Sequence, residues 1–358
     1  MKKNKFSGFN LIFFIASFGC LFVLAAVVII VDPLFHYHAP IGNMRYILYE
    51  ERYQNDGISK FFDYDALLTG TSMVENTLIS DVNDAFGVNA VKTCYMGGSY
   101  SEIDSNIRVA LEHNPNLKTV LRATDQFDVI RDADFHISTD PARNYDYPWY
   151  LVNDNPFDDV KYIFNKKLLE ATITDAMWTL KDHPSTTFDE YGYWANLYTF
   201  SKDTVLSSYA KYDVNENVTP FTDEDRQTVY ENVTRNVINT AKEHPDVTFY
   251  IWIPPYSIAY YDEEHRSGNL ARDLDAMEYE LELLTSVDNI KAFAFADRYD
   301  IVENLDLYKD VQHYAPSVNA ELIRCMADEK GLITADNYKE YMSQIRDHYL
   351  NFDYNSIY

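Results

Sequence analysis

Hydrophobic positions along the chain form one long run near the N-terminus and several short runs further on. The long run covers residues 9–31 and is almost unbroken. As a helix that rises ~1.5 Å per residue it is about 34 Å long, which is enough to cross a bilayer core of ~30 Å. Lys2, Lys3 and Lys5 precede the run, and Asp32 follows it. The positive-inside rule then places the N-terminus in the cytoplasm and the remainder of the chain outside the cell.

A cleaved signal peptide is the competing interpretation, since it also begins with basic residues. Its apolar core is usually only ~7–15 residues long and is followed by a small-x-small cleavage site. Here the run is longer, and bulky Ile29, Ile30 and Val31 stand where small residues are needed. We therefore predict a single-pass anchor in the cell membrane, with a cytoplasmic tail at 1–8, a transmembrane helix at 9–31, a juxtamembrane segment at 32–60 and an extracellular domain at 61–358.

Beyond the anchor, short β-rich runs alternate with helical runs. The β-rich runs predict strands at 66–69, 89–95, 119–123, 247–253 and 290–295. The helical runs predict helices at 73–86, 101–113, 222–244, 269–286 and 317–329. Thr222 is the expected N-cap of the third of these helices, and Pro245 ends it. The alternation predicts a three-layer α/β/α fold around a five-stranded parallel sheet of the flavodoxin-like kind.

Residues 132–221 break this alternation. The stretch is rich in Tyr, Trp and Asp, contains helical patches, and separates the third and fourth predicted strands. A connection of this length inside an α/β domain is typically a functional insertion. Ligands of such folds bind at the carboxyl ends of the strands. We therefore predict that the insertion forms a cap beside the ligand site.

Composition narrows the class of partner. Apolar residues make up 47% of the chain, which is ample for a core and excludes a disordered tail. The net charge of −26 repels nucleic acid, so a nucleic-acid partner is excluded. Cys20 lies in the apolar run, while Cys94 and Cys325 either pair or remain two buried thiols, and buried thiols are favoured. No cofactor motif is present, because the G-x-G-x-x-G spacing is absent.

Candidate chemistry begins at the end of the first predicted strand. Gly70, Thr71 and Ser72 stand there, directly before a predicted helix. A serine at a helix N-terminus lies near free N–H groups that favour a developing negative charge, as a nucleophile requires. The alternative is that Ser72 only caps the helix, which is a frequent role of serine.

The second strand ends at Gly97 and Gly98. Without a Cβ atom, their backbone N–H groups can approach a ligand closely and contribute to an oxyanion hole. A tight turn between a strand and a helix also favours glycine, so both interpretations stand.

After the fifth strand, Asp310 and His313 are three residues apart in a loop that precedes a helix. The imidazole can deprotonate Ser72, and the carboxylate can fix the tautomer and orientation of the imidazole. A surface loop with two polar residues is the alternative. A metal site needs more ligands than this pair offers, so none is predicted.

In combination, these motifs resemble those of the SGNH or GDSL-like serine hydrolases. The resemblance implies Ser72 as nucleophile, His313 as base, Asp310 as its partner, and backbone N–H groups of Ser72 and Gly97 as oxyanion donors. The chain departs from the pattern in reading Gly-Thr-Ser for Gly-Asp-Ser. Where the family places an oxyanion Asn after the third strand, this chain has Asp125, whose ionised carboxylate would repel an oxyanion.

Two further residues belong to the expected site. Either the oxyanion hole is incomplete, or Asn76 or another donor replaces the missing asparagine. Tyr256, which follows the fourth strand at the ligand edge, is expected to line the acceptor site; the alternative is that it belongs to a turn made by the two preceding prolines.

The anchor and the domain together are similar to membrane-tethered SGNH-like proteins of the bacterial cell envelope, such as the teichoic-acid D-alanyl transfer protein and the alginate acetylation proteins. The similarity implies a serine esterase or O-acyltransferase that acts on a cell-envelope polymer through an acyl-serine, beside a multi-spanning membrane acyltransferase. Hydrolysis and transfer share the acyl-serine, so the residues do not separate them. A non-catalytic surface binding protein and an accessory subunit of the acyltransferase remain as alternatives.

Overall fold

The computed structural model describes residues 5–139, 147–153, 155–209 and 211–358. The chain divides into two compact units. The first unit comprises Met1–Phe62 and Tyr147–Thr187, and the second comprises Asp63–Asp146 and Phe188–Tyr358. The stretch predicted as one insertion thus contributes to both units. Lys2 and Lys3, on which the predicted topology partly depends, lie outside the described residues.

A six-stranded sheet forms the centre of the second unit. Its strands are β1 Ala66–Gly70, β2 Ala90–Cys94, β3 Thr119–Ala123, β4 Thr248–Ile253, β5 Ile290–Ala294 and β6 Leu332–Ile333. They are arranged in the order β2-β1-β3-β4-β5-β6, and the first five are parallel. All five predicted strands are therefore present, in the flavodoxin-like order.

The prediction of a purely parallel, five-stranded sheet is wrong at one edge. Strand β6 pairs antiparallel with β5 through Ala292 with Ile333 and Phe293 with Leu332. Two residues are too few to display the alternation by which a strand is identified in a sequence. This edge strand is therefore visible only through its tertiary pairing.

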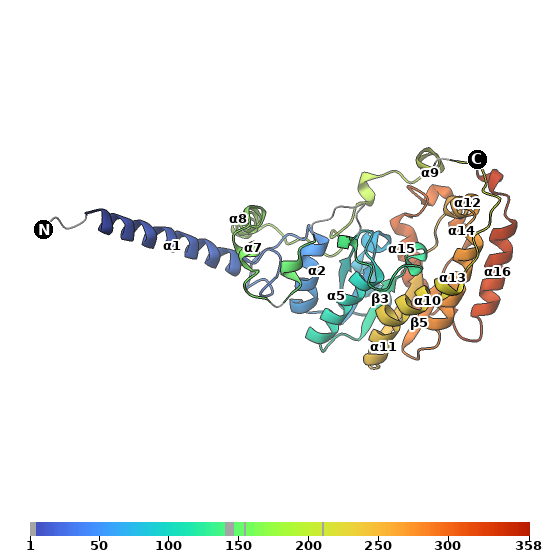
Figure 1. Ribbon diagram of the computed structural model, residues 1–358, viewed down its shortest axis with the longest axis horizontal. Helices are drawn as coiled ribbons and strands as arrows, with labels where there is room; N and C mark the ends of the chain where they lie inside the picture. The colour runs from blue at the N-terminus through green and yellow to red at the C-terminus, as the bar shows by residue number, and fades with distance from the viewer. Residues whose placement is uncertain (1–4, 140–146, 154, 210) are drawn as a thin grey trace. The chain divides into compact units, whose positions relative to one another are not determined.

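Helices lie in front of and behind the strands of this sheet (Figure 1). One group consists of α4 and α15, which contact each other, and another is connected through contacts among α5, α10, α13 and α16. The helices of the second unit are α3 Ser72–Glu75, α4 Ile79–Phe86, α5 Tyr100–His113, α6 Gln126–Val129, α9 Lys202–Ser208, α10 Asp223–Val233, α11 Asn239–Glu243, α12 Ile258–Ser267, α13 Leu270–Leu284, α14 Tyr299–Val302, α15 Pro316–Ala327 and α16 Tyr338–Asn351.

Two helix predictions have different outcomes. Thr222 caps α10 as predicted, in a capping box with Asp225, and a π-helical segment at Thr234–Ile238 joins α10 to α11. The helix predicted at 73–86 is instead two helices, α3 and α4, separated by residues 76–78. Neither Cys94 nor Cys325 forms a disulfide.

Charged side chains are buried in the strands and connect the sheet to its helices. Lys92 of β2 is fully buried, and its ammonium donates to the carbonyl oxygens of Glu75 at 2.6 Å and Thr77 at 3.1 Å. Arg122 of β3 donates to the carbonyl oxygens of Asn236 at 2.6 Å and Tyr100 at 3.2 Å. Each cation is thereby hydrogen-bonded to backbone carbonyls of the segments that pack on the sheet.

Glu280 of α13 is buried beside this layer and accepts a hydrogen bond from the Tyr100 hydroxyl at 2.8 Å. Burial raises the pKa of Glu280 to about 7, against the opposing hydrogen bond. Because the pKa of Glu280 in the folded state lies above its ordinary value, the folded state is most stable at low pH, where the side chain is protonated. This contribution to the free energy of unfolding is lost as the pH rises toward 7. We expect Glu280→Gln to increase the free energy of unfolding at pH 8 by up to about 3 kcal/mol.

Urea unfolding at pH 5 and pH 8 measures this effect. The difference in free energy of unfolding between Glu280→Gln and the natural chain should be smaller at pH 5, where the natural side chain is protonated in the folded state. Glu282→Gln, on an exposed position of the same helix, is the matched control and should change little at either pH. An equal pH dependence in the natural chain and Glu280→Gln would refute the assignment.

The first unit contains the N-terminal helix α1 Lys5–Val31, with α2 Glu51–Phe61, α7 Val160–Ile163 and α8 Lys166–Leu180. Within α1, the segment Phe9–Val31 is long and apolar enough to cross a membrane, and only 6% of its most apolar window is buried. Val28, near its end, is buried in a small core with Leu34, Leu151, Tyr162 and Leu168.

Asp32 ends α1 and reverses the direction of the chain. Its φ of +47° is a left-handed conformation. Its carboxylate accepts the backbone N–H groups of His36, Tyr37 and His38 at 2.8 to 3.0 Å. The Tyr162 hydroxyl donates to the same carboxylate at 2.5 Å. These four donors explain how a charged residue is tolerated at 1% exposure.

Candidate active site

Ser72 lies at the carboxyl end of β1, where the chain turns into α3. Gly70 has a φ of +154°, and an added Cβ atom would meet Val74 at 3.0 Å and Ala123 at 3.1 Å. Conformation and space therefore both require glycine here. Thr71 is the N-cap of α3, and Ser72 is its first residue. Because α3 has only four residues, its dipole at Ser72 is weaker than that of the single helix predicted at 73–86.

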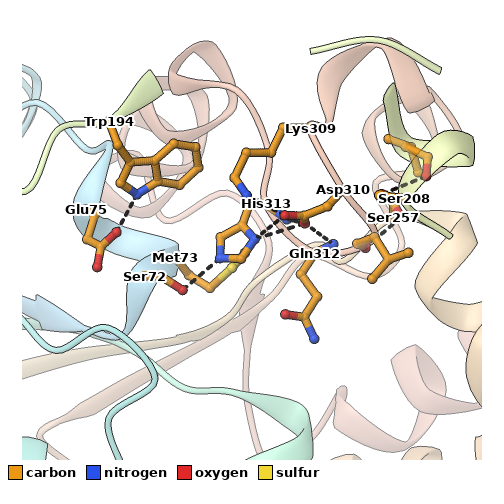
Figure 2. A network of polar contacts seen from close by, with 12 residues as sticks. Ser72, Met73, Glu75, Trp194, Ser208, Ser257, Lys309, Asp310, Gln312 and His313 are labelled. Atoms are coloured by element: carbon orange, nitrogen blue, oxygen red, sulfur yellow. Dashed lines mark hydrogen bonds and ion pairs between the residues drawn. The ribbon is translucent and has the colours of Figure 1, made fainter. Parts of the chain in front are cut away.

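The structure brings Ser72 together with both predicted partners, which lie more than 200 residues away in the chain. Ser72 Oγ is 2.8 Å from His313 Nε2. His313 Nδ1 is 2.9 Å from each carboxylate oxygen of Asp310 (Figure 2). Nδ1 can therefore donate to the carboxylate while Nε2 accepts the serine proton. This is the arrangement that activates a serine as a nucleophile.

Asp310 is held by several donors besides the imidazole. Its Oδ1 accepts the backbone N–H groups of Gln312 at 2.9 Å and His313 at 2.8 Å. Its Oδ2 accepts the Lys309 ammonium at 2.5 Å. Burial alone would raise the pKa of Asp310, but hydrogen bonds from His313 and Lys309 outweigh it and hold that pKa well below its ordinary value. The carboxylate is therefore ionised at neutral pH and can stabilise an imidazolium.

The loop that carries His313 is closed at its base and attached to a neighbouring segment. Tyr308 and Tyr314 form an isolated β-bridge. The carbonyl oxygen of Val311 accepts both the backbone N–H of Ser257 at 3.2 Å and its hydroxyl at 2.7 Å. Ser257 is itself the N-cap of α12. These contacts fix the histidine relative to the sheet edge (Figure 2).

Residues that the sequence did not point to complete one side of the site. The Trp194 indole N–H donates to the Glu75 carboxylate, and its ring meets the His313 imidazole edge-on at 5.5 Å between centroids. The Lys309 ammonium lies 4.8 Å from the ring centroids of both Trp194 and Tyr198. Lys309 could have been suspected from its position next to Asp310, whereas no sequence signal links Trp194 to the triad.

Asn76 has a structural role in this arrangement. Its side-chain oxygen accepts the backbone N–H groups of Trp194 at 3.1 Å and Ala195 at 2.9 Å. The residue is 2% exposed. Asn76 thus holds the segment that places Trp194 against the imidazole, and the oxyanion role of its side-chain NH₂ group stays a prediction.

Gly97 and Gly98 form the tight turn between β2 and α5. Gly97 has a φ of +60°. A Cβ atom added to Gly98 would lie 2.6 Å from that of Tyr95 and 3.1 Å from a carboxylate oxygen of Glu102. The turn interpretation therefore suffices to explain both glycines, and the oxyanion role of Gly97 stays a prediction.

Asp125 follows β3 and is 3% exposed. Its carboxylate accepts hydrogen bonds from the Tyr256 hydroxyl and from the side chain of Thr71, the residue before Ser72. Burial raises the pKa of Asp125, and these hydrogen bonds and His313 partly oppose the rise. Asp125 therefore braces the segment that carries the nucleophile.

Tyr256 was predicted to line an acceptor site, and the structure contradicts this. Its side chain is fully buried, packs against Tyr260 at 4.6 Å between ring centroids, and directs its hydroxyl at Asp125. The alternative, a turn made by the two preceding prolines, fits the hydrogen bond from the Tyr256 backbone N–H to the Pro254 carbonyl oxygen at 3.1 Å.

No group of three or more His, Cys, Asp or Glu side chains suited to a metal ion occurs among the residues that the structure describes.

Comparisons with known proteins add little to this description. No protein-family model matches the chain, and no curated protein matches it. One solved structure, described as "The structure of a putative platelet activating factor from Streptococcus pneumonia", is similar at 9% sequence identity and a TM-score of 0.39. The similarity covers 81% of this chain and 90% of that one. A likeness this distant carries no functional inference, so the function of this chain is inferred from the geometry of its own site.

Proposed function

We propose that this chain is a serine esterase or O-acyltransferase of SGNH type that acts through an acyl-Ser72 intermediate. The observation that carries the proposal is the continuous set of contacts from Ser72 Oγ through both ring nitrogens of His313 to Asp310. An ordinary helix-capping serine needs neither a base nor a carboxylate behind that base, so this arrangement favours the nucleophile over the cap.

The reaction follows from the atoms present. Ser72 Oγ attacks the carbonyl carbon of an ester while His313 Nε2 takes the hydroxyl proton, and Asp310 stabilises the resulting imidazolium. The imidazolium returns the proton to the departing alkoxide, which leaves an acyl-serine. Water or a second hydroxyl then attacks the acyl-serine, with His313 as base again, and releases either the acid or a new ester.

We further propose that the reaction takes place outside the cell, on an acyl group of a cell-envelope polymer. The apolar helix α1 supports an anchor, and the basic residues before it favour a cytoplasmic N-terminus. A multi-spanning membrane acyltransferase is the expected partner, because an external transferase needs a source of activated acyl groups.

The test uses the full-length chain in detergent with p-nitrophenyl esters of short acids. After a brief reaction and acid quench, the peptide that contains Ser72 should carry the acyl group by mass spectrometry. Adding a polysaccharide fragment with free hydroxyls should divert acyl groups from water to the fragment if the chain is a transferase. Absence of acylation with every ester, together with retained binding of the polysaccharide, would favour the non-catalytic surface protein instead.

A further inference from the structure

The first unit exposes apolar side chains on helix α8 that its core does not use. One face of α8 is buried through Leu168, Thr172 and Asp175. On the remaining surface, Ile173 is 51% exposed and Leu180 is 86% exposed. Exposure of this degree on one short helix calls for an explanation, because isolated surface apolar residues are common but aligned ones are not.

These residues form a stripe. At about 100° per residue, the exposed side chains of Ile173, Met177 and Leu180 fall within a sector about 60° wide, beside the buried face. Lys166 lies in the same sector at the start of the helix, and Leu169, at the edge of the sector, packs partly against the core. Glu170 and Thr174 occupy the other side of the exposed surface. The solvent-facing half of α8 is therefore itself divided into an apolar and a polar part, which is unlike an ordinary surface helix.

Helix α8 also has a defined place beside the N-terminal helix. Leu168 shares a core with Val28, at the end of α1 where the predicted transmembrane segment finishes. Figure 1 shows α8 almost end-on where α1 runs across the view, so α8 lies crosswise to α1. A helix that packs crosswise on the end of a membrane-spanning helix lies along the membrane surface.

Local charge fits the same position. In the segment 160–181, exposed lysines outnumber the acidic residues although the whole chain carries −26; the lysines are Lys161, Lys166, Lys167 and Lys181. The acidic residues are Glu170 and the buried Asp175. An apolar stripe with flanking lysines is the composition of helices that lie in the interface of a bilayer.

We propose that α8 is an interfacial helix whose stripe, defined by Ile173, Met177 and Leu180, is embedded in the lipid headgroup and upper acyl-chain region of the bilayer that α1 crosses. This inference rests on the anchor in the proposed function. The occupant of the stripe is lipid, because the stripe adjoins the exit of α1, and contacts with another protein would need no lysine border.

Site-directed spin labelling of the full-length chain in phosphatidylcholine vesicles with some phosphatidylglycerol tests the proposal. The native cysteines are replaced first, and single labels are introduced through Ile173→Cys and Leu180→Cys. Thr174→Cys is the matched control on the polar side, and Phe14→Cys reports on the middle of α1. Power saturation compares collisions with oxygen, which concentrates in lipid, and with a water-soluble nickel chelate.

We expect the ratio of oxygen to nickel accessibility to be several-fold higher at 173 and 180 than at 174, and highest at 14. If the label at 14 is exposed to lipid but the labels at 173 and 180 are exposed to water, the interfacial helix is refuted and the anchor is retained. The stripe would then be assigned to contact with a second protein. Water exposure at 14 would overturn the anchor and the interfacial helix together. Esterase activity is measured separately in each variant, so loss of either membrane inference is distinguishable from failure of the enzyme.

Discussion

Ser72→Ala should abolish acylation by short esters and lower kcat by roughly 10⁴–10⁶, the range seen when a serine nucleophile that works with a histidine is removed. The loss is this large because the acyl-serine through which both half-reactions pass cannot form without the Ser72 hydroxyl. His313→Ala should cost about the same, since an unactivated hydroxyl is a poor nucleophile at neutral pH. The double variant should be no worse than either single variant, because the two side chains act as one unit.

The measurement is ester turnover together with covalent labelling by a fluorophosphonate, which reports on the serine without needing the natural substrate. Ser80→Ala is the matched control, because Ser80 is exposed and contacts Asp189 only through its backbone N–H. Full activity of Ser72→Ala toward every ester, with a folded protein by circular dichroism, would show that Ser72 is not the nucleophile and would refute the acyl-Ser72 mechanism.

Asp310→Asn should lower kcat by about 10⁴ with little change in substrate binding, by analogy with the effect of an amide at this place in a serine triad. The carboxylate accepts two backbone N–H groups, the imidazole and the Lys309 ammonium. An amide has one acceptor atom, so its NH₂ group must face the imidazole or the ammonium. The imidazole then favours the tautomer with its proton on Nε2, which cannot accept the proton of Ser72.

Steady-state kinetics over a range of pH tests this outcome. Asp306→Asn provides a matched carboxylate-to-amide change nearby, on an exposed residue that accepts the backbone N–H of Lys202. It should leave kcat within a few-fold. A kcat for Asp310→Asn within tenfold of the natural chain would show that Asp310 does not orient the base.

The parts that could be predicted from the sequence are those with a local signal. The five parallel strands are mostly apolar because both faces of the sheet are covered, with Lys92 of β2 and Arg122 of β3 as buried exceptions. Ser72 was found because it directly follows the first strand, at the edge where ligands of such sheets bind. Asp310 and His313 were found because they are three residues apart in the loop before the last predicted helix. Resemblance to a known family supplied their roles, and the geometry places them within hydrogen-bonding distance of one another.

The parts that could not be predicted depend on contacts between distant residues. The hydrogen bond from Trp194 to Glu75 joins the insertion to α3, and nothing near either residue marks it. Tyr256 was expected at the surface because it follows a strand, yet its hydroxyl meets a carboxylate that is more than a hundred residues away. Hydrophobic periodicity and turn residues report on neighbours in the chain, so they do not predict hydrogen bonds between residues that are far apart in it.

The four hydrogen bonds to Asp32 determine how rigidly α1 is joined to the rest of the first unit. A flexible linker as long as the segment 32–60 would let the domain that follows it move by roughly 30 Å from the end of α1. Here the chain is fixed within six residues of the end of α1, and the next residues pack into the same unit. The first unit therefore has no flexible segment where α1 joins the rest of it, so any movement of α1 is passed directly to the core that contains Val28.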